Sequence, residues 1–145
     1  MPAKLVGAIV TVIGVIFVAA GATTWFLVQT QLADEHITVA SDSSWLAGND
    51  VNGPLSAYAE AQVIQRHALD ATGGQTYAQL ERTDPLRDTA MTASVLRGSL
   101  FTSVVAFGVA AFAIVMGVVL VLLGLAVRQI APATTESRTR VTPLT

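Results

Sequence analysis

The sequence predicts an all-α membrane protein in which two transmembrane helices form an antiparallel hairpin with a small, mainly helical extracytoplasmic head. No residue with a formal charge lies between Lys4 and Asp34, and none lies between Arg97 and Arg128. Each stretch is longer than the roughly 20 apolar residues that cross the hydrocarbon core of a bilayer. Only 12% of the residues are charged, compared with about 25% in soluble domains. The chain is therefore expected to reside in lipid.

The charges predict the orientation of the two spans. The middle of the chain, residues 33 to 97, contains nine acidic residues and four arginines, whereas the flanking ends carry four basic residues and one acid. Segments rich in lysine and arginine tend to stay in the cytoplasm. We therefore expect a multi-pass protein of the plasma membrane with both termini cytoplasmic and the head outside. The acidic head also argues against nucleic acid as a partner, because nucleic acid requires a basic surface.

The first span is expected at residues 5–29, after a short cytoplasmic N-terminus of residues 1–4. Its small residues Ala20, Gly21 and Ala22 resemble a signal-peptide cleavage site. The apolar stretch continues past them, however, beyond the 7 to 15 residues of a usual signal-peptide core. An uncleaved anchor is the favoured interpretation, with Trp25 near the outer interface and Phe101 as its counterpart in the second span.

The head is expected at residues 30–97. A helix is predicted from Pro54 to Thr72. Proline suits the first helical position, and the apolar residues then recur at helical spacing until Gly73 and Gly74, which end the helix. Upstream, residues 37–39 form a short β-prone run, and residues 41–48 could hold one helical turn. The chain has no cysteine, so disulfides cannot stabilise a segment of this size, and we expect it to depend on the spans or on a partner.

A long helix is expected to start at about residue 85, where Asp84 precedes Pro85, and to run into the membrane. No proline interrupts the chain from there to Arg128, and Gly98 is the only weak position before lipid depth. The second span is expected at residues 98–128. The threonine-rich residues 129–145 are expected to be a disordered cytoplasmic tail.

Small residues recur at helical spacing in both spans and predict a helix-packing face. Glycines occur every seven residues in the first span, and alanines and glycines follow spacings of three, four and seven in the second. These residues form one stripe along each helix. In an antiparallel hairpin, a single register pairs Gly7 with Gly124, Gly14 with Gly117 and Gly21 with Ala110. Small side chains let helix backbones approach closely. The alternative interpretation is that these small residues mediate contacts between separate chains of an oligomer. The helix-packing residues are Gly7, Gly14, Gly21, Ala106, Ala110, Ala113, Gly117 and Gly124.

Candidate chemistry is sparse. His67 with Asp70 or Glu60, joined by His36 beside Glu35, could offer imidazole and carboxylate groups to a metal or act in acid/base catalysis. Solvated polar residues on a helix surface are the favoured interpretation. No nucleophile or oxyanion hole accompanies these residues, so we predict no catalytic residue, metal or cofactor.

Three aromatic residues of the head, Trp45, Tyr58 and Tyr77, could form an apolar binding patch. Packing of a small head around their rings is the favoured alternative. The pair Gly73 and Gly74 is interpreted as a helix stop, since no phosphate-loop pattern follows it.

The runs GPLSAYAEAQVIQRHALDATGGQTYAQL (53–80) and DPLRDTAMTASVLRGSLFTSVVAFGVA (84–110) resemble a group of small, uncharacterised two-span membrane proteins of actinobacteria. Some members carry the label of an aromatic ring-opening dioxygenase. Two histidines in a small head scarcely provide the ligands of a ring-cleaving iron site, so the label is unsupported here. The resemblance implies an actinobacterial plasma-membrane protein and brings no functional residues with it.

The leading hypothesis is a non-enzymatic accessory or scaffold protein whose partners are the lipid bilayer and other membrane proteins or a second copy of itself. A channel or transporter subunit is the main alternative, although polar residues in the spans are limited to a few hydroxyls. A metal-binding enzyme acting through the head is the least favoured hypothesis. The hydroxyl residues in or near the spans are Thr11, Thr23, Thr24, Thr102 and Ser103.

Overall fold

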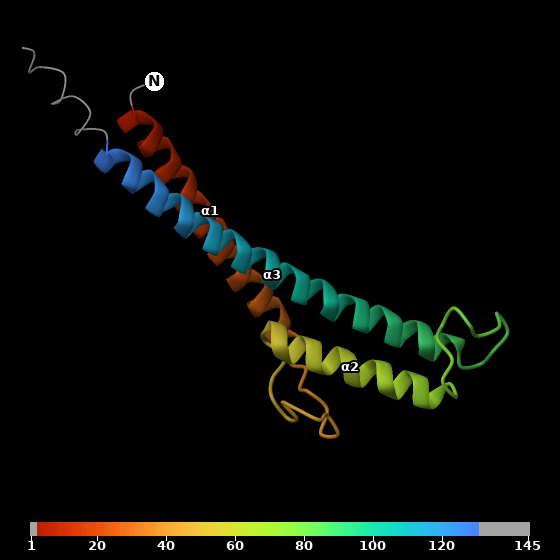
Figure 1. Ribbon diagram of the computed structural model, residues 1–145. Helices are drawn as coiled ribbons and strands as arrows, with labels where there is room; N and C mark the ends of the chain where they lie inside the picture. Colours follow the sequence, from red (N-terminus) through yellow and green to blue (C-terminus); the bar gives the residue numbers. More distant parts are fainter. Residues whose placement is uncertain (1–2, 131–145) are drawn as a thin grey trace, which may run out of the picture. The chain divides into compact units, whose positions relative to one another are not determined.

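Three α-helices account for most of the chain in the computed structural model, which describes residues 3–130. They are α1 (Ala3–Asp34), α2 (Pro54–Ala71) and α3 (Arg87–Ile130) (Figure 1). No strand is assigned within the described residues. The predicted all-helical class is thereby confirmed. Residues 1–2 of the expected cytoplasmic N-terminus and residues 131–145 of the expected disordered tail lie outside the described residues.

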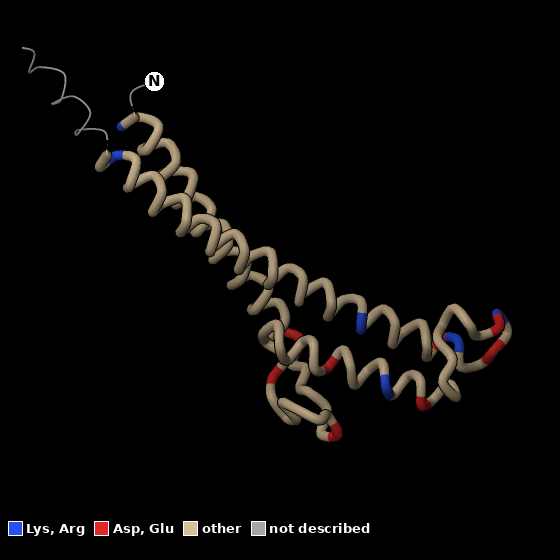
Figure 2. The backbone as a smooth tube through the Cα atoms, viewed as in Figure 1, with Lys and Arg blue, Asp and Glu red and all other residues tan. Residues whose placement is uncertain are grey.

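Helices α1 and α3 are both long and apolar enough to cross a membrane. They contain 32 and 44 residues, which correspond to about 48 and 66 Å at 1.5 Å per residue. Both lengths exceed the roughly 30 Å of a hydrocarbon core. Figure 2 shows that the lysine, arginine and acidic residues lie toward the ends of these helices and in the segment that joins them, with a long uncharged run in each.

Helix α1 ends where the chain enters a left-handed conformation. The N–H groups of Glu35 and His36 donate to the carbonyl oxygens of Leu32 and Ala33 at 3.3 and 3.1 Å. His36 then has a φ of 52°, a value that a helix cannot continue. The helix thus extends five residues beyond the predicted span end at residue 29.

The segment between α1 and α2 is a folded loop closed by backbone hydrogen bonds. Thr38 and Asp50 form a single antiparallel bridge, and the N–H of Val39 donates to the carbonyl of Asn49 at 2.9 Å. Of the β-prone residues 37–39, Thr38 therefore forms a single β-bridge and no strand. The suggested helical turn within residues 41–48 is wrong, because the chain makes turns and bends there and Leu46 has a φ of 56°.

Helix α2 agrees closely with its predicted limits. Pro54 occupies the first turn, and Ser56 Oγ accepts the N–H of Gly53 at 3.2 Å, which satisfies a donor at the helix start. The helix ends at Ala71, after which Gly73 and Gly74 have φ values of 63° and 85°. The predicted helix stop at this glycine pair is confirmed.

Helix α3 starts two residues later than predicted and then continues without a break. Asp84 Oδ1 accepts the N–H of Leu86 at 2.8 Å, and the N–H of Arg87 donates to the carbonyl of Asp84 at 3.1 Å. Asp84 therefore closes a turn around Pro85, and regular helix begins at Arg87. Gly98 lies within the uninterrupted helix, as predicted.

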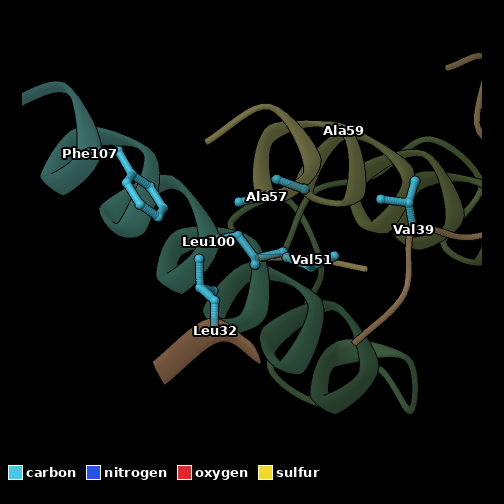
Figure 3. Close-up of a cluster of buried hydrophobic side chains, with 8 residues drawn as sticks. Leu32, Val39, Val51, Ala57, Ala59, Leu100 and Phe107 are labelled. Atoms are coloured by element: carbon cyan, nitrogen blue, oxygen red, sulfur yellow. The ribbon is translucent and has the colours of Figure 1, made fainter. Parts of the chain in front are cut away.

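The chain divides into two compact units. The first unit contains α1 up to Thr23 and α3 from Ala110, and the second runs from Thr24 to Val109. The hydrophobic core of the second unit draws on α1, the folded loop, α2 and α3 (Figure 3). Side chains of this core that are almost fully buried include Val39, Val51, Ala57 and Phe107. The expected dependence of the head on the long helices has a structural basis here, since Leu32 and Phe107 lie outside residues 33–97.

Candidate functional site

The glycines of the first unit lie at close approaches between α1 and α3. A Cβ atom added to Gly14 would lie 2.6 Å from the carbonyl oxygen of Gly117, and a Cβ on Gly7 would lie 2.6 Å from that of Gly124. A Cβ on Gly21 would lie 2.7 Å from the carbonyl oxygen of Ala110. Real Cβ atoms essentially never come this close, so only glycine fits at these three positions of α1.

The predicted helix-packing residues differ in burial. The five glycines of the two stripes and Ala110 are buried, whereas Ala106 and Ala113 are half-buried. The buried positions recur every seven residues on both helices, at residues 7, 14 and 21 and at residues 110, 117 and 124. A strict seven-residue repeat keeps one face aligned over several turns. The structure thus brings together the three pairs that the spacing predicts.

Three hydroxyl groups of the long helices, those of Thr11, Thr102 and Ser103, bond within their own helices. Thr11 Oγ1 donates to the carbonyl of Gly7 at 2.8 Å, and Thr102 Oγ1 donates to that of Gly98 at 2.9 Å. Ser103 Oγ donates to the carbonyl of Ser99 at 3.3 Å. Hydroxyls satisfied in this way do not present a row of free polar groups to an ion or a substrate.

A charged cluster joins the folded loop to α2 in the second unit. Arg66 Nη2 lies 2.9 Å from Asp42 Oδ2, and His67 Nε2 lies 2.7 Å from the same oxygen. Hydrogen bonds from His67 and then from Arg66 lower the pKa of the Asp42 carboxyl from 3.8 to about 2. Because all three side chains are about half exposed, we interpret the cluster as a surface tether of the loop.

The residues weighed as metal ligands in the sequence are not brought together in the structure. His67 contacts Asp42, a residue the sequence did not single out, rather than Asp70 or Glu60. Glu60 is 9% exposed, and its Oε2 accepts the backbone N–H of Ala40 at 2.8 Å. No group of three or more histidine or acidic side chains suited to a metal occurs within residues 3–130. Glu60 therefore serves to hold the folded loop on α2.

The aromatic residues separate into two groups. The ring of Trp45 lies 6.4 Å from that of Tyr58, which in turn meets Phe101 edge-on at 5.7 Å. Tyr77 instead packs against Arg87, whose Cζ atom lies 4.2 Å from the centroid of the Tyr77 ring. The three aromatics therefore do not form one binding patch: Trp45 and Tyr58 pack together with Phe101 of α3, and Tyr77 packs with Arg87.

An open groove of about 620 Å³ runs between α2 and the first turns of α3. Its walls are mainly apolar, with His67 and Asp88 as the charged or titratable residues among those that line it. Met91 and Val95 extend this surface along α3, and they are 49% and 61% exposed. Sequence reasoning missed the groove, although an apolar row between two arginines at the start of a long helix is a signal for it. The apolar lining residues are Ile64, Ala68, Ala71, Ala93 and Leu96.

Comparison of the chain with known protein families, with curated proteins and with solved structures finds no match. The geometry of the two units therefore carries the functional argument.

Proposed function

We propose that this chain is a non-enzymatic integral membrane protein that serves as an accessory or scaffold component of a larger membrane complex. Its long helices form a transmembrane hairpin, and its head docks on a partner through the groove between α2 and α3. The observation that carries the docking proposal is the exposed apolar row of Met91, Val95 and Leu96 beside that groove.

Lipid does not account for this row. It lies between Arg87 and Arg97, with Asp88 next to it, and charged side chains keep a helix segment out of the hydrocarbon core. A monomeric head would therefore hold exposed leucine, methionine and valine side chains in water. Contiguous apolar surface of this kind is typical of interaction sites.

The partner we propose is a helical segment of another membrane protein that has one apolar face and basic flanking residues. A groove between two helices accepts the side-chain ridge of a third helix. The nine acids and four arginines of residues 33–97 give the head a net negative charge, which favours a basic partner.

The hairpin and its orientation are supported by the backbone contacts at the glycines and by the distribution of charge. The short distances from Gly7, Gly14 and Gly21 to α3 are typical of closely packed membrane helices. Lys4 and Arg128 lie at the same end of the first unit, since Arg128 contacts the Gly7 position. Basic residues at that end favour its placement in the cytoplasm of a plasma membrane, with the head outside.

The docking proposal is testable with a photo-crosslinking amino acid placed at Val95 of the full-length protein in its native membrane. We expect a crosslink to a basic helical segment of another membrane protein, identified by mass spectrometry, and a lower yield in Asp88→Asn. The same amino acid at Ala78, which is exposed and does not line the groove, is the control. Crosslinks only to lipid or only to a second copy of the chain would overturn docking on another protein, and so would an equal yield from position 78.

The competing functions have less support. A channel or transporter subunit requires a polar path, and the hydroxyls of Thr11, Thr102 and Ser103 are bonded within their helices. An enzyme requires a reactive group beside a binding cavity. Within residues 3–130, the one histidine–carboxylate pair is His67 with Asp42, which is exposed and is also bound to an arginine.

A further inference from the structure

Three large side chains remain exposed at and near the start of α2. Leu55, in the first turn, is 65% exposed, and Tyr58, one turn further on the same helix face, is 37% exposed. Trp45 of the folded loop is 36% exposed, and its ring lies 6.4 Å from that of Tyr58. We call these three residues the α2 patch. None of them lines the docking groove, so the proposed protein partner does not cover the patch.

The start of α2 is the end of that helix nearest to the uncharged run of α3. Tyr58 meets Phe101 edge-on at 5.7 Å, whereas Ala68, later in α2, lines a groove with Ala93, earlier in α3. The residue numbers thus rise along one helix as they fall along the other, which makes the two helices antiparallel. The α2 patch therefore lies at the end of α2 that is directed toward the uncharged residues 98–127.

The contact with Phe101 gives the depth of the patch in the proposed transmembrane hairpin. Phe101 follows Arg97, the last charged residue of α3 before Arg128, by one helical turn, or about 6 Å. An arginine at the end of a membrane helix extends to the headgroups, so Phe101 lies where hydrocarbon meets headgroups. Tyrosine and tryptophan rings are enriched at this depth. The contact between Tyr58 and Phe101 holds the patch at the same level.

The exposed face of α2 beside the patch carries no charge. Between Leu55 and Gln65 the one charged residue is Glu60, which is 9% exposed and bonded to the backbone of the folded loop. The first exposed charge of α2 is Arg66, roughly 16 Å from Leu55 along the helix. Asp50, exposed in the loop before α2, requires that this end stays at the level of the headgroups. The charge pattern therefore suits a shallow position in a bilayer.

We propose that the α2 patch binds a lipid surface, namely the headgroup layer of the bilayer that α1 and α3 span, with Leu55 in contact with acyl chains. The inference rests on the transmembrane hairpin of the proposed function. A helix that lies in the interface buries its apolar face at the boundary between headgroups and acyl chains. Lipid thereby covers side chains that would otherwise face water. The exposed row of the docking groove precedes Arg97 in α3 and stays in the aqueous phase, available to a protein partner.

Site-directed spin labelling of the full-length protein in phosphatidylcholine vesicles tests this placement. The chain has no cysteine, so a nitroxide on Leu55→Cys reports a single site. Oxygen concentrates in the bilayer, whereas a nickel chelate stays in water, and the label at residue 55 should be reached by oxygen in preference to the chelate. Phe26→Cys, at a position of α1 that is 66% exposed, is the lipid reference. Ala78→Cys, exposed and outside the patch, is the water reference.

A charged variant tests the patch through Trp45. Trp25→Phe leaves Trp45 as the one tryptophan of the chain, and lipids with a nitroxide near the headgroup should quench its fluorescence. Leu55→Glu in this background should cause loss of most of the quenching, because a charge at the patch opposes its contact with acyl chains. The fold should persist, since Leu55 is exposed and an acidic residue favours the first turn of a helix. Ala78→Glu is the matched control and should leave the quenching unchanged.

The outcomes distinguish failure of this inference from failure of the proposed function. If the chelate reached the label at residue 55 as readily as that at residue 78, while oxygen was preferred at residue 26, lipid contact of the patch would be wrong and the hairpin would stand. A label at residue 55 shielded from both oxygen and the chelate would show that a protein covers the patch, and unchanged quenching in Leu55→Glu would show that Leu55 does not hold it in lipid. Either result would overturn the inference. If the chelate reached residue 26, the hairpin itself would fail, and the inference with it.

Discussion

The two units of the chain are built with opposite distributions of side-chain size. In the first unit the buried positions are glycines and Ala110, while large residues such as Ile16 and Val115 are 59% and 63% exposed. In the second unit the buried positions include Val39, Val51 and Phe107. Helices α1 and α3 contribute to both arrangements, because each belongs in part to both units, whereas α2 lies wholly in the second unit.

The difference follows from the surroundings expected for each unit. Between two helices in lipid, exchanging a lipid contact for a leucine contact gains little, so close backbone approach and weak Cα–H···O contacts become the main attraction. Where several segments converge, as they do around Leu32 and Leu100 in Figure 3, burial of large side chains becomes favourable again. Small residues are therefore typical of the buried positions in the first unit, and aromatic and branched residues are typical of those in the second unit.

The largest effect is expected from removal of a large buried side chain in the second unit. Phe107 is 1% exposed and meets Trp25 edge-on at 4.7 Å. Phe107→Ala should lower the free energy of unfolding by about 3–5 kcal/mol, measured by denaturant titration in micelles with tryptophan fluorescence as the probe. Phe112→Ala is the matched control on the same helix, because Phe112 is 63% exposed. Similar losses from both variants would contradict the distinction between the units.

A smaller effect is expected in the first unit, where adding a methyl group, rather than removing a side chain, should weaken the packing of the helices. A Cβ on Gly117 would lie 2.6 Å from the carbonyl oxygen of Gly14 and 2.7 Å from the backbone nitrogen of Val18. Because backbone atoms cannot rotate away, Gly117→Ala should force the helices apart at a cost of about 1–3 kcal/mol. Spin labels on cysteines at Ile16 and Val115 would report a longer, broader distance distribution in bilayers.

The control for this prediction uses the same substitution on the same helix. A Cβ on Gly108 would meet nothing within 4 Å, so Gly108→Ala should leave the label distances unchanged, and it favours the helix by up to about 1 kcal/mol. If Gly117→Ala also preserved the distances, close backbone contact at Gly117 would be refuted. Contacts only between separate chains would assign the glycines to an oligomer interface.

Sequence patterns predict the local features of this protein better than its long-range contacts. The limits of α2 follow from Pro54 and the Gly73–Gly74 pair, and the glycine pairs follow from a seven-residue spacing on two long helices. The bridge from Thr38 to Asp50 and the contact of His67 with Asp42 depend on how the loop returns to α2. No local pattern encodes that return, and Leu46 in particular adopts a conformation that leucine rarely takes.

The smallest of these effects concerns pH, and it should be confined to the second unit. Hydrogen bonds from His67, and then from Arg66, lower the pKa of Asp42 from 3.8 to about 2. A carboxyl whose pKa is lower in the folded state contributes stability that is present above about pH 4 and is lost as the pH falls through about 2.

Carbon-13 NMR of the Asp42 carboxyl in full-length protein should therefore give a midpoint near 2. The midpoint should rise toward its ordinary value more in His67→Ala than in Arg66→Ala, because the histidine bond is the larger cause. Asp70→Asn, on the same helix and outside both ion pairs, should leave the midpoint unchanged.

Over the same pH range, the spin-label distances of the first unit should stay constant, since no ionisable side chain lies between Lys4 and Thr23 or between Ala110 and Arg128. A pH-dependent change in those distances would mean that the charges of the head help to hold the long helices together, and the two units would then have to be treated as one.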